Sequence, residues 1–222
     1  MGLLSYSYMK NSVVSVGEVF SFAWGEFKKN PWFYIGVTFL LLLVSSLVSA
    51  LTSGPHGQTT ILGFLISYVV SVVIAIAFAR LALAASAGEK VGWGALWAPE
   101  HFLNMLGASI IQGVIIVVGF VLLVIPGIIA SLLLMFTQLS VVDKKMNPFE
   151  AIKNSYYLAK SHLFDLFILF LALLVLNFVG LVALVVGLFV TVPLTVIAVA
   201  HVYRTLSQAQ EPMVSVSNET PQ

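Results

Sequence analysis

Few side chains in this sequence could do chemistry, and the most conspicuous is Arg80, a cation inside a long apolar run. A second ion, Asp165, stands at the start of another apolar run. An ionised side chain left unpaired in a lipid bilayer is costly, so a charge inside a membrane span is a functional candidate. The alternative is structural: Arg80 extends from near a helix end to the headgroups, or pairs with Asp165, which also suits the positive N-terminal end of its helix. Both interpretations of the two ions stay open.

Gln112 lies near the middle of a third apolar run and is the best candidate for a residue that lines a passage or a binding site. A glutamine amide at this depth also suits a hydrogen bond between two helices. The same two interpretations apply to four other polar residues inside apolar runs: Gln138, Asn177, Thr191 and Thr195.

The residue types that most catalytic and metal sites require are missing or scattered. The chain has no cysteine, which excludes disulfides, a thiolate nucleophile and cysteine-ligated zinc or iron–sulfur centres. Its four histidines show no paired-ligand spacing, and no phosphate-binding glycine-rich loop, nucleophile elbow or His-Glu-x-x-His motif occurs. We therefore expect no catalytic residue, no metal and no cofactor, and a protein that is not an enzyme. The net charge of +1 predicts no nucleic-acid partner.

The composition places the elements around these residues in a membrane. Of 222 residues, 60% are hydrophobic and 9% are charged, whereas soluble domains carry about 25% charged residues. The length suffices for about six membrane helices of roughly 20 residues with short loops. The expected fold is therefore an all-α integral membrane domain, whose six transmembrane helices occupy roughly 32–51, 61–85, 103–124, 128–142, 164–179 and 182–203.

Each pair of spans follows a segment that suits the membrane surface. The first, 15–29, begins with Ser15 in the Ser-x-x-Glu spacing of a capping box and then repeats apolar residues every three or four positions. The second, 93–97, is short and contains two tryptophans. The third, 147–163, begins with Asn147 followed by proline and, two residues later, glutamate. The sequence thus predicts three transmembrane hairpins, each preceded by a cytoplasmic interfacial amphipathic helix.

The second span carries a seam of small residues at every fourth position: Gly63, Ser67, Ser71, Ala75 and Ala79. Residues four apart share one face of a helix, and in lipid a face of small residues lets another backbone approach closely. Small residues are also simply common in membrane helices. We favour the packing interpretation and expect this span to be the central packing helix.

Prolines predict two breaks within the apolar regions. Pro126 and Gly127 predict a tight reversal between the third and fourth spans. Pro193 predicts a kink in the sixth span, because proline lacks the N–H that would bond the carbonyl of Phe189.

The distribution of charge predicts the orientation. All ten basic residues fall on the side of the N-terminus, whereas the three opposite turns, around His56, Pro126 and Gly180, carry no charge. By the positive-inside rule, both termini are expected in the cytoplasm. Lysines beside the surface helices would each gain about 1 kcal/mol from anionic lipid. The expected partner is therefore the lipid bilayer, with anionic lipid at the cytoplasmic face.

The arrangement of a surface helix followed by a hairpin occurs three times, over about 15–87, 88–145 and 146–206. We interpret 1–206 as one membrane domain with pseudo-threefold character, arising either by duplication or from the recurring physics of such units. The polar segment 207–222 is expected to be a disordered cytoplasmic tail.

Several short motifs are spread over most of the chain: 126–128 (Pro-Gly-Ile), 141–143 (Val-Val-Asp), 151–156 (Ala-Ile-Lys-Asn-Ser-Tyr) and 203–206 (Tyr-Arg-Thr-Leu), together with Pro193. They resemble a broad group of six-helix bacterial membrane proteins, whose best-known relative is the membrane domain attached to some glycerophosphodiester phosphodiesterases. The soluble phosphodiesterase domain of that relative is absent from this sequence. The resemblance therefore implies an integral protein of the bacterial cytoplasmic (inner) membrane and carries over no catalytic residue.

Three classes of function remain. The least favoured is an intramembrane enzyme, because it would need acid, base or nucleophile residues that converge within the membrane, and only Arg80 and Asp165, near one surface, are available. The first expectation is a non-enzymatic scaffold, accessory subunit or envelope-homeostasis protein that acts through helix packing, with a protein partner or as a homo-oligomer. The alternative is a transporter or lipid-handling module, which would use the broken sixth span and a site near mid-membrane. That alternative predicts that Gln112 and the Pro193 region face one shared cavity.

Overall fold

A computed structural model describes residues 15–53, 60–89, 92–96, 99–183 and 187–218. The turn predicted around His56, the basic residues Lys10 and Lys90, and Trp97 lie outside these residues. Within them the chain is helical, and six helical segments are long and apolar enough to cross a membrane: Pro31–Thr52, Ile61–Ser86, Pro99–Leu122, Val124–Lys144, Leu163–Val182 and Leu188–Gln210. The prediction of an all-α chain with six such segments is confirmed.

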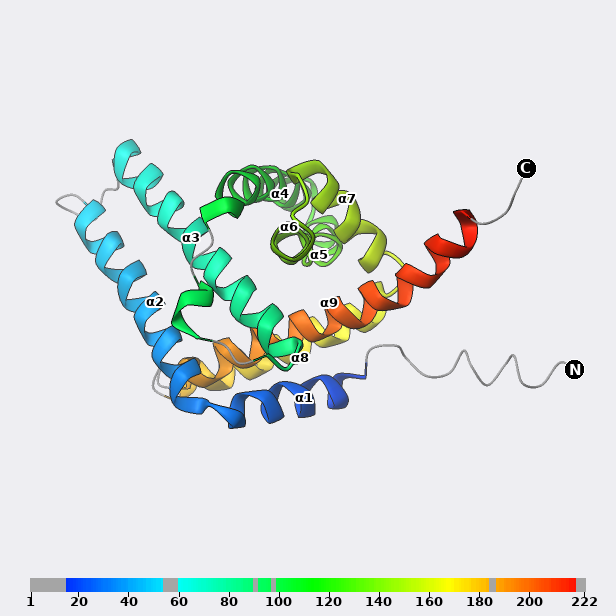
Figure 1. Cartoon of the computed structure of the whole chain (residues 1–222). Coiled ribbons are helices and arrows are strands. Elements are labelled where there is room, and N and C mark those ends of the chain that lie inside the picture. The colour runs from blue at the N-terminus through cyan, green and yellow to red at the C-terminus, as the bar shows by residue number, and fades with distance from the viewer. Residues whose placement is uncertain (1–14, 54–59, 90–91, 97–98, 184–186, 219–222) are drawn as a thin grey trace, which may run out of the picture.

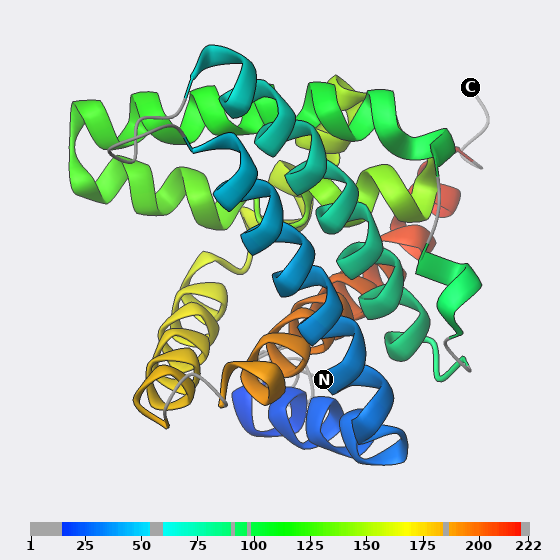
Figure 2. The ribbon, with the colours of Figure 1, turned by 90° about the vertical axis from the view of Figure 1, so that its left-hand side faces the viewer.

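The helices pack as an open assembly in which long segments cross at steep angles (Figure 1). α3 and α9 contact each other, and α1 lies along α9 (Figures 1 and 2). α4 and α5 run side by side as an antiparallel pair, with α6 and α7 close by (Figure 2). The elements are α1 (Val16–Lys29), α2 (Pro31–Thr52), α3 (Ile61–Ser86), η2 (Trp93–Leu96), η3 (Pro99–His101), α4 (Phe102–Leu122), α5 (Val124–Leu133), α6 (Thr137–Lys144), α7 (Pro148–Ala159), α8 (Leu163–Val182) and α9 (Leu188–Asn218).

Of the two helix starts predicted from capping residues, the one at Asn147 has its cap and the one at Ser15 does not. Pro31 opens α2 directly after Asn30, and Asn147 forms a complete capping box with Glu150 at the start of α7. The capping box predicted at Ser15 is wrong, because the Ser15 side chain makes no capping hydrogen bond and only its backbone carbonyl bonds to Val19. The second predicted surface segment, 93–97, is described only as far as residue 96, and Trp93–Leu96 forms one 3₁₀ turn.

α2 and α3 approach most closely at Gly63. A Cβ on Gly63 would lie 2.6 Å from the carbonyl oxygen of Thr52 on α2. One turn further along α3, the hydroxyls of Ser67 and Thr52 hydrogen bond at 3.0 Å. The first part of the small-residue seam therefore packs against α2, as a seam of this kind allows.

The reversal between the third and fourth spans differs from the prediction for Pro126 and Gly127. The turn centres on Leu123, whose extended backbone (φ −169°, ψ 159°) separates α4 from α5. Pro126 lies in the first turn of α5, where a backbone N–H has no helical partner and proline is tolerated. Gly127 faces α4, and a Cβ there would overlap the ring of Phe120. The glycine serves close helix packing rather than the turn.

The fourth span is broken, which the sequence analysis did not predict. α5 ends at Leu133, and residues 134–136 form a tighter turn before α6 begins at Thr137. The backbone N–H groups of Met135 and Thr137 bond to the carbonyls of Leu132 and Leu134, three residues back.

The last two spans also have different ends from those predicted. α8 continues through Gly180 to Val182, and α9 begins at Leu188 rather than at residue 182. Pro193 lies in the second turn of α9. The segment expected to be disordered from residue 207 continues α9 as helix to Asn218. Ser207 is buried, and Gln210 donates a hydrogen bond to the Tyr157 carbonyl at 3.3 Å, so contacts with α7 extend the helix beyond the apolar run.

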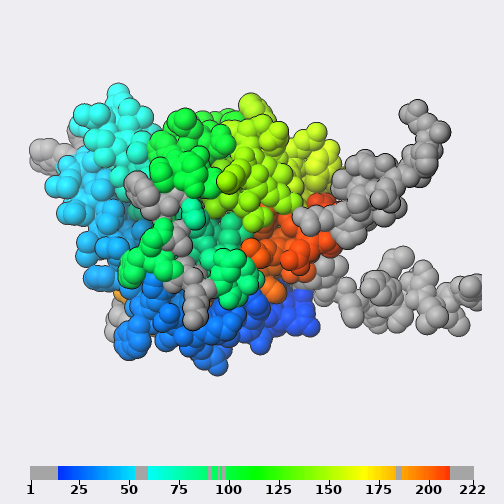
Figure 3. Space-filling view, viewed as in Figure 1, coloured from blue at the N-terminus to red at the C-terminus, as the bar shows by residue number. Residues whose placement is uncertain are grey.

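The buried core lies where α3, α6, α7 and α9 meet, around the rings of Phe136 and Tyr203, whose centroids are 5.9 Å apart. The far ends of the helices are exposed: Leu51, Val121 and Val182 are at least 66% accessible. The distal parts of α2 and α3 form one edge of the space-filling view (Figure 3). Exposed apolar surface of this kind suits contact with lipid chains.

The α2–α3 contact gives a stability test with a matched control. Gly63→Ala should lower the free energy of unfolding by about 1–3 kcal/mol, because the added methyl meets the Thr52 carbonyl. Gly36→Ala on α2 adds the same methyl in open space and should raise stability by about 0.5–1 kcal/mol. Chemical unfolding in mixed micelles measures both. Equal effects of the two substitutions would contradict a close approach at Gly63.

Candidate functional site

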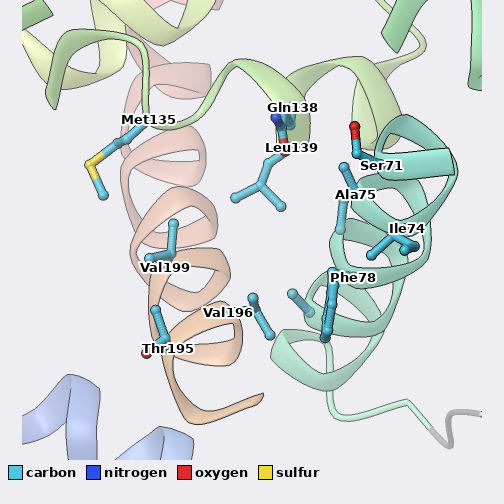
Figure 4. Close-up of a pocket in the computed structure, with 12 residues that line it drawn as sticks. Ser71, Ile74, Ala75, Phe78, Met135, Gln138, Leu139, Thr195, Val196 and Val199 are labelled. Atoms are coloured by element: carbon cyan, nitrogen blue, oxygen red, sulfur yellow. The ribbon is translucent and has the colours of Figure 1, made fainter. Parts of the chain in front are cut away.

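An apolar cavity lies between α3, α9 and the α5–α6 junction (Figure 4). It has a volume of about 370 Å³. Nine of its twelve lining residues are apolar, and they include Phe78 on α3, Leu139 on α6 and Val199 on α9. The three polar lining residues are Ser71, Gln138 and Thr195.

The second half of the small-residue seam opens this cavity rather than closing it. Ser71, Ala75 and Ala79 line the α3 side, about one to three turns beyond Ser67. Their short side chains leave space that leucine or phenylalanine would fill. The seam therefore has two roles: its first residues pack against α2, and its later residues form a wall of the cavity.

Most polar atoms at the cavity are satisfied by neighbouring protein groups. Thr195 donates to the carbonyl of Thr191 and accepts a hydrogen bond from the amide of Asn177 on α8, both at 2.8 Å. Ser71 donates to the Tyr68 carbonyl at 2.7 Å. The side chain of Gln138 makes no hydrogen bond to any residue that the structure describes. Gln138 is therefore the lining group that is free to meet a ligand.

The break between α5 and α6 shapes the upper wall of the cavity, and α7 holds it in place. Ser155 on α7 is fully buried; its hydroxyl accepts a hydrogen bond from the Phe136 N–H at 3.1 Å and donates to the Leu133 carbonyl at 2.8 Å. The neighbouring Asn154 donates to the Ser140 hydroxyl at 2.9 Å. The two bonds of Ser155 satisfy backbone groups that the break leaves without helical partners.

Gln112 lies outside the cavity. Its amide nitrogen donates to the Leu134 carbonyl at 3.0 Å, so it makes the interhelical hydrogen bond that was one of its two interpretations. Its amide oxygen is buried without a partner. The prediction that Gln112 and the Pro193 region face one shared cavity is therefore wrong for Gln112. The cavity is lined instead by Gln138 and by Thr195, two residues beyond Pro193.

Arg80 does not pair with Asp165. Its guanidinium lies 3.5 Å from the carboxylate of Glu100, which precedes α4 and also lies 3.7 Å from His101 Nε2. Asp165 is half-buried on α8, which packs against α9 and α5. The predicted pair fails because the segment before α4 brings Glu100 to the end of α3 instead.

Arg80 belongs to a second, charged pocket of about 350 Å³. The pocket gathers residues from the end of α3, the start of α4, the end of α6 and α9. Its ionisable residues are Arg80, Glu89, Glu100, His101, Asp143, Lys145 and Arg204. Asp143 accepts a hydrogen bond from the Tyr203 hydroxyl at 3.0 Å, which ties α6 to α9 beside the pocket.

Lys145, which lines this pocket, ends α6 in a backbone conformation that is uncommon for a residue with a Cβ. It follows α6 in the left-handed conformation (φ 51°, ψ 32°), the only positive φ found outside glycine in the described residues. That conformation is disfavoured for a residue with a Cβ by about 1–2 kcal/mol. Within the part of the chain that the structure describes, no group of three or more His, Cys, Asp or Glu residues could hold a metal ion.

Comparison of the chain with protein-family models, with curated proteins and with solved structures found no match to any of them. The function of the protein is therefore inferred from the lining and the contacts of the two pockets.

Sequence reasoning missed the residues that organise both pockets. Ser155 and Asn154 stand among ordinary amphipathic residues, and no spacing rule links them to a break 20 residues earlier. Glu100 and His101 fall between apolar runs, outside the search for intramembrane ions. The motif at 151–156 was the available signal, since it contains both α7 residues that hold the α5–α6 junction.

The clamp at the α5–α6 junction gives a second test. Ser155→Ala should lower the free energy of unfolding by about 1–3 kcal/mol, because the buried Phe136 N–H loses its only hydrogen-bond partner. Ser131→Ala removes a hydroxyl that bonds only within its own helix, to Gly127, and should change stability by less than about 0.5 kcal/mol. Unfolding in mixed micelles compares the two variants. Similar small effects would show that the junction does not depend on Ser155.

Proposed function

We propose that this protein is a lipid-handling membrane protein that holds an apolar chain in the cavity between α3, α9 and the α5–α6 junction. The observation that carries the proposal is the lining: nine apolar residues around about 370 Å³ of space. Ligand sites in proteins have this size and character, with a few polar groups that orient the ligand. An apolar cavity of this kind disfavours water.

The surroundings supply the ligand class. The cavity lies between helices long and apolar enough to cross a bilayer, so the most abundant apolar molecule beside it is a lipid chain. The Gln138 amide gives such a ligand one polar contact. These observations support the lipid-handling hypothesis. The scaffold hypothesis has no comparable support, because we identify no particular docking surface for a protein partner among the described residues. We propose no catalytic role.

We also propose that the six spans form three hairpins with both termini in the cytoplasm of a bacterial cell, in the cytoplasmic membrane. The basic residues of α1, α7 and the α6 end support this orientation by the positive-inside rule. The ends of α2, α4 and α8 lie toward the same side in Figure 2, and no charged residue lies in the last turn of any of them.

Filling the cavity tests the lipid proposal. Ala75→Phe places a ring in the space beside Phe78 and should reduce, severalfold, the crosslinking of a phospholipid with a photoactivatable acyl tail to the cavity helices. Val69→Phe makes an apolar enlargement at an exposed position of α3 and should leave crosslinking unchanged. Mass spectrometry of the crosslinked peptides is the readout.

Two outcomes would overturn the lipid proposal. Equal crosslinking in Ala75→Phe and Val69→Phe would show that the lipid binds elsewhere. A protein partner that co-purifies stoichiometrically in native mass spectrometry, with no lipid crosslinked to the cavity, would favour the scaffold or accessory hypothesis.

Single cysteines test the orientation, because the natural chain has none. Ser53→Cys, just beyond α2, should react with a membrane-impermeant maleimide on intact cells. Lys153→Cys on α7 should react only after the cells are opened. The reverse pattern would contradict the proposed orientation.

A further inference from the structure

We propose that the charged pocket at Arg80 binds the headgroup of a zwitterionic aminophospholipid, with the phosphate on Arg204 and Lys145 and the ammonium on Glu89 and Asp143. This site is separate from the apolar cavity, and the proposal does not depend on the cavity being occupied. It assigns a ligand to a pocket where the described residues gather both signs of charge beside spanning helices.

Two cations of the pocket have no protein counter-ion. Arg80 is engaged by Glu100 at 3.5 Å. Arg204 and Lys145 form no ion pair with any described residue, and the buried Nε of Arg204 has no hydrogen-bond partner there. A buried donor without a partner is costly, and a guanidinium binds phosphate oxygens with paired, charge-assisted hydrogen bonds. A phosphate group would satisfy both cations.

The balance of charge selects a zwitterion over a plain anion. The pocket holds three cations, Arg80, Lys145 and Arg204, against three carboxylates, Glu89, Glu100 and Asp143. Of the carboxylates, Glu100 is paired with Arg80, whereas the exposed Glu89 and Asp143 form no ion pair with any other residue that the structure describes. A phosphate alone would bring a further negative charge beside these two groups. A headgroup that also carries an ammonium gives each of them a partner.

The position of the pocket selects a lipid over a soluble zwitterion. Arg80 lies in the last two turns of α3, and Asp143 and Lys145 lie at the end of α6, where two apolar spans give way to charged residues. Lipid headgroups occupy this depth of a bilayer, at the boundary between the hydrocarbon core and water. The volume of about 350 Å³ admits a phosphate and an ethanolamine group.

The test is native mass spectrometry of the full-length protein released from nanodiscs that contain equal amounts of phosphatidylethanolamine and phosphatidylglycerol. The natural protein should retain phosphatidylethanolamine preferentially. Arg204→Gln combined with Lys145→Gln should reduce the amount of both retained lipids by about tenfold, since both lose charge-assisted bonds to their phosphate. Glu89→Gln combined with Asp143→Asn should instead reduce the preference for phosphatidylethanolamine by about tenfold, since only that lipid carries the ammonium. Arg204→Lys keeps the charge and should keep both the amount of retained lipid and the preference.

Lys28→Gln combined with Lys153→Gln is the matched control, because it removes the same two charges from the surface helices α1 and α7. It should leave the amount of retained lipid and the headgroup preference unchanged. Ala75→Phe should also leave the headgroup preference unchanged, which separates this site from the apolar cavity.

Three outcomes would overturn the proposal. A preference for phosphatidylglycerol in the natural protein would show a plain anion site. A loss of retained lipid in the Lys28→Gln, Lys153→Gln control equal to that of Arg204→Gln, Lys145→Gln would show an effect of general surface charge. Displacement of the lipid by soluble glycerophosphoethanolamine at low concentration would show that the ligand is a soluble zwitterion.

Discussion

The structure depends on one constraint: inside a bilayer, every backbone polar group must find a partner within the protein. The break between α5 and α6 would leave several such groups without a partner in the protein interior. Gln112 bonds the Leu134 carbonyl, and Ser155 bonds both the Leu133 carbonyl and the Phe136 N–H. With these partners, α6 can leave the axis of α5, form the upper wall of the apolar cavity and carry Asp143 and Lys145 to the charged pocket.

The number and type of long helices followed from apolar run length, because a bilayer of fixed thickness requires about 20 apolar residues per span. The break at 134–136 was not predictable, because leucine, methionine and phenylalanine there are compatible with an uninterrupted helix. Pro126 was misjudged for a related reason: proline suits both a reversal and the first turn of a helix. The close packing of the next residue, Gly127, against the Phe120 ring is seen only in the structure, and it places this segment in α5 beside α4.

Within the candidate sites, the sequence identified polar and charged residues that need a partner more readily than it identified the partners themselves. Arg80 was identified as an ion in need of a partner, yet its partner Glu100 came from a segment between apolar runs. The small-residue seam of α3 was predicted as one packing face. In the structure only its beginning, at Gly63 and Ser67, meets α2, because α2 and α3 contact closely over a short stretch. The remaining residues of the seam are left to border empty space.

The two hydrogen bonds of Ser155 couple the position of α7 to the α5–α6 junction. α7 places Lys153 and Lys160 against the rings of Tyr156 and Tyr157, on the face of the helix away from the core. A rotation of α7 must move the buried Ser155 hydroxyl and so strain or release the α5–α6 junction that it holds. A surface signal, such as a change in local lipid charge or a docked protein, would thereby alter the interior space without any of its lining residues being touched.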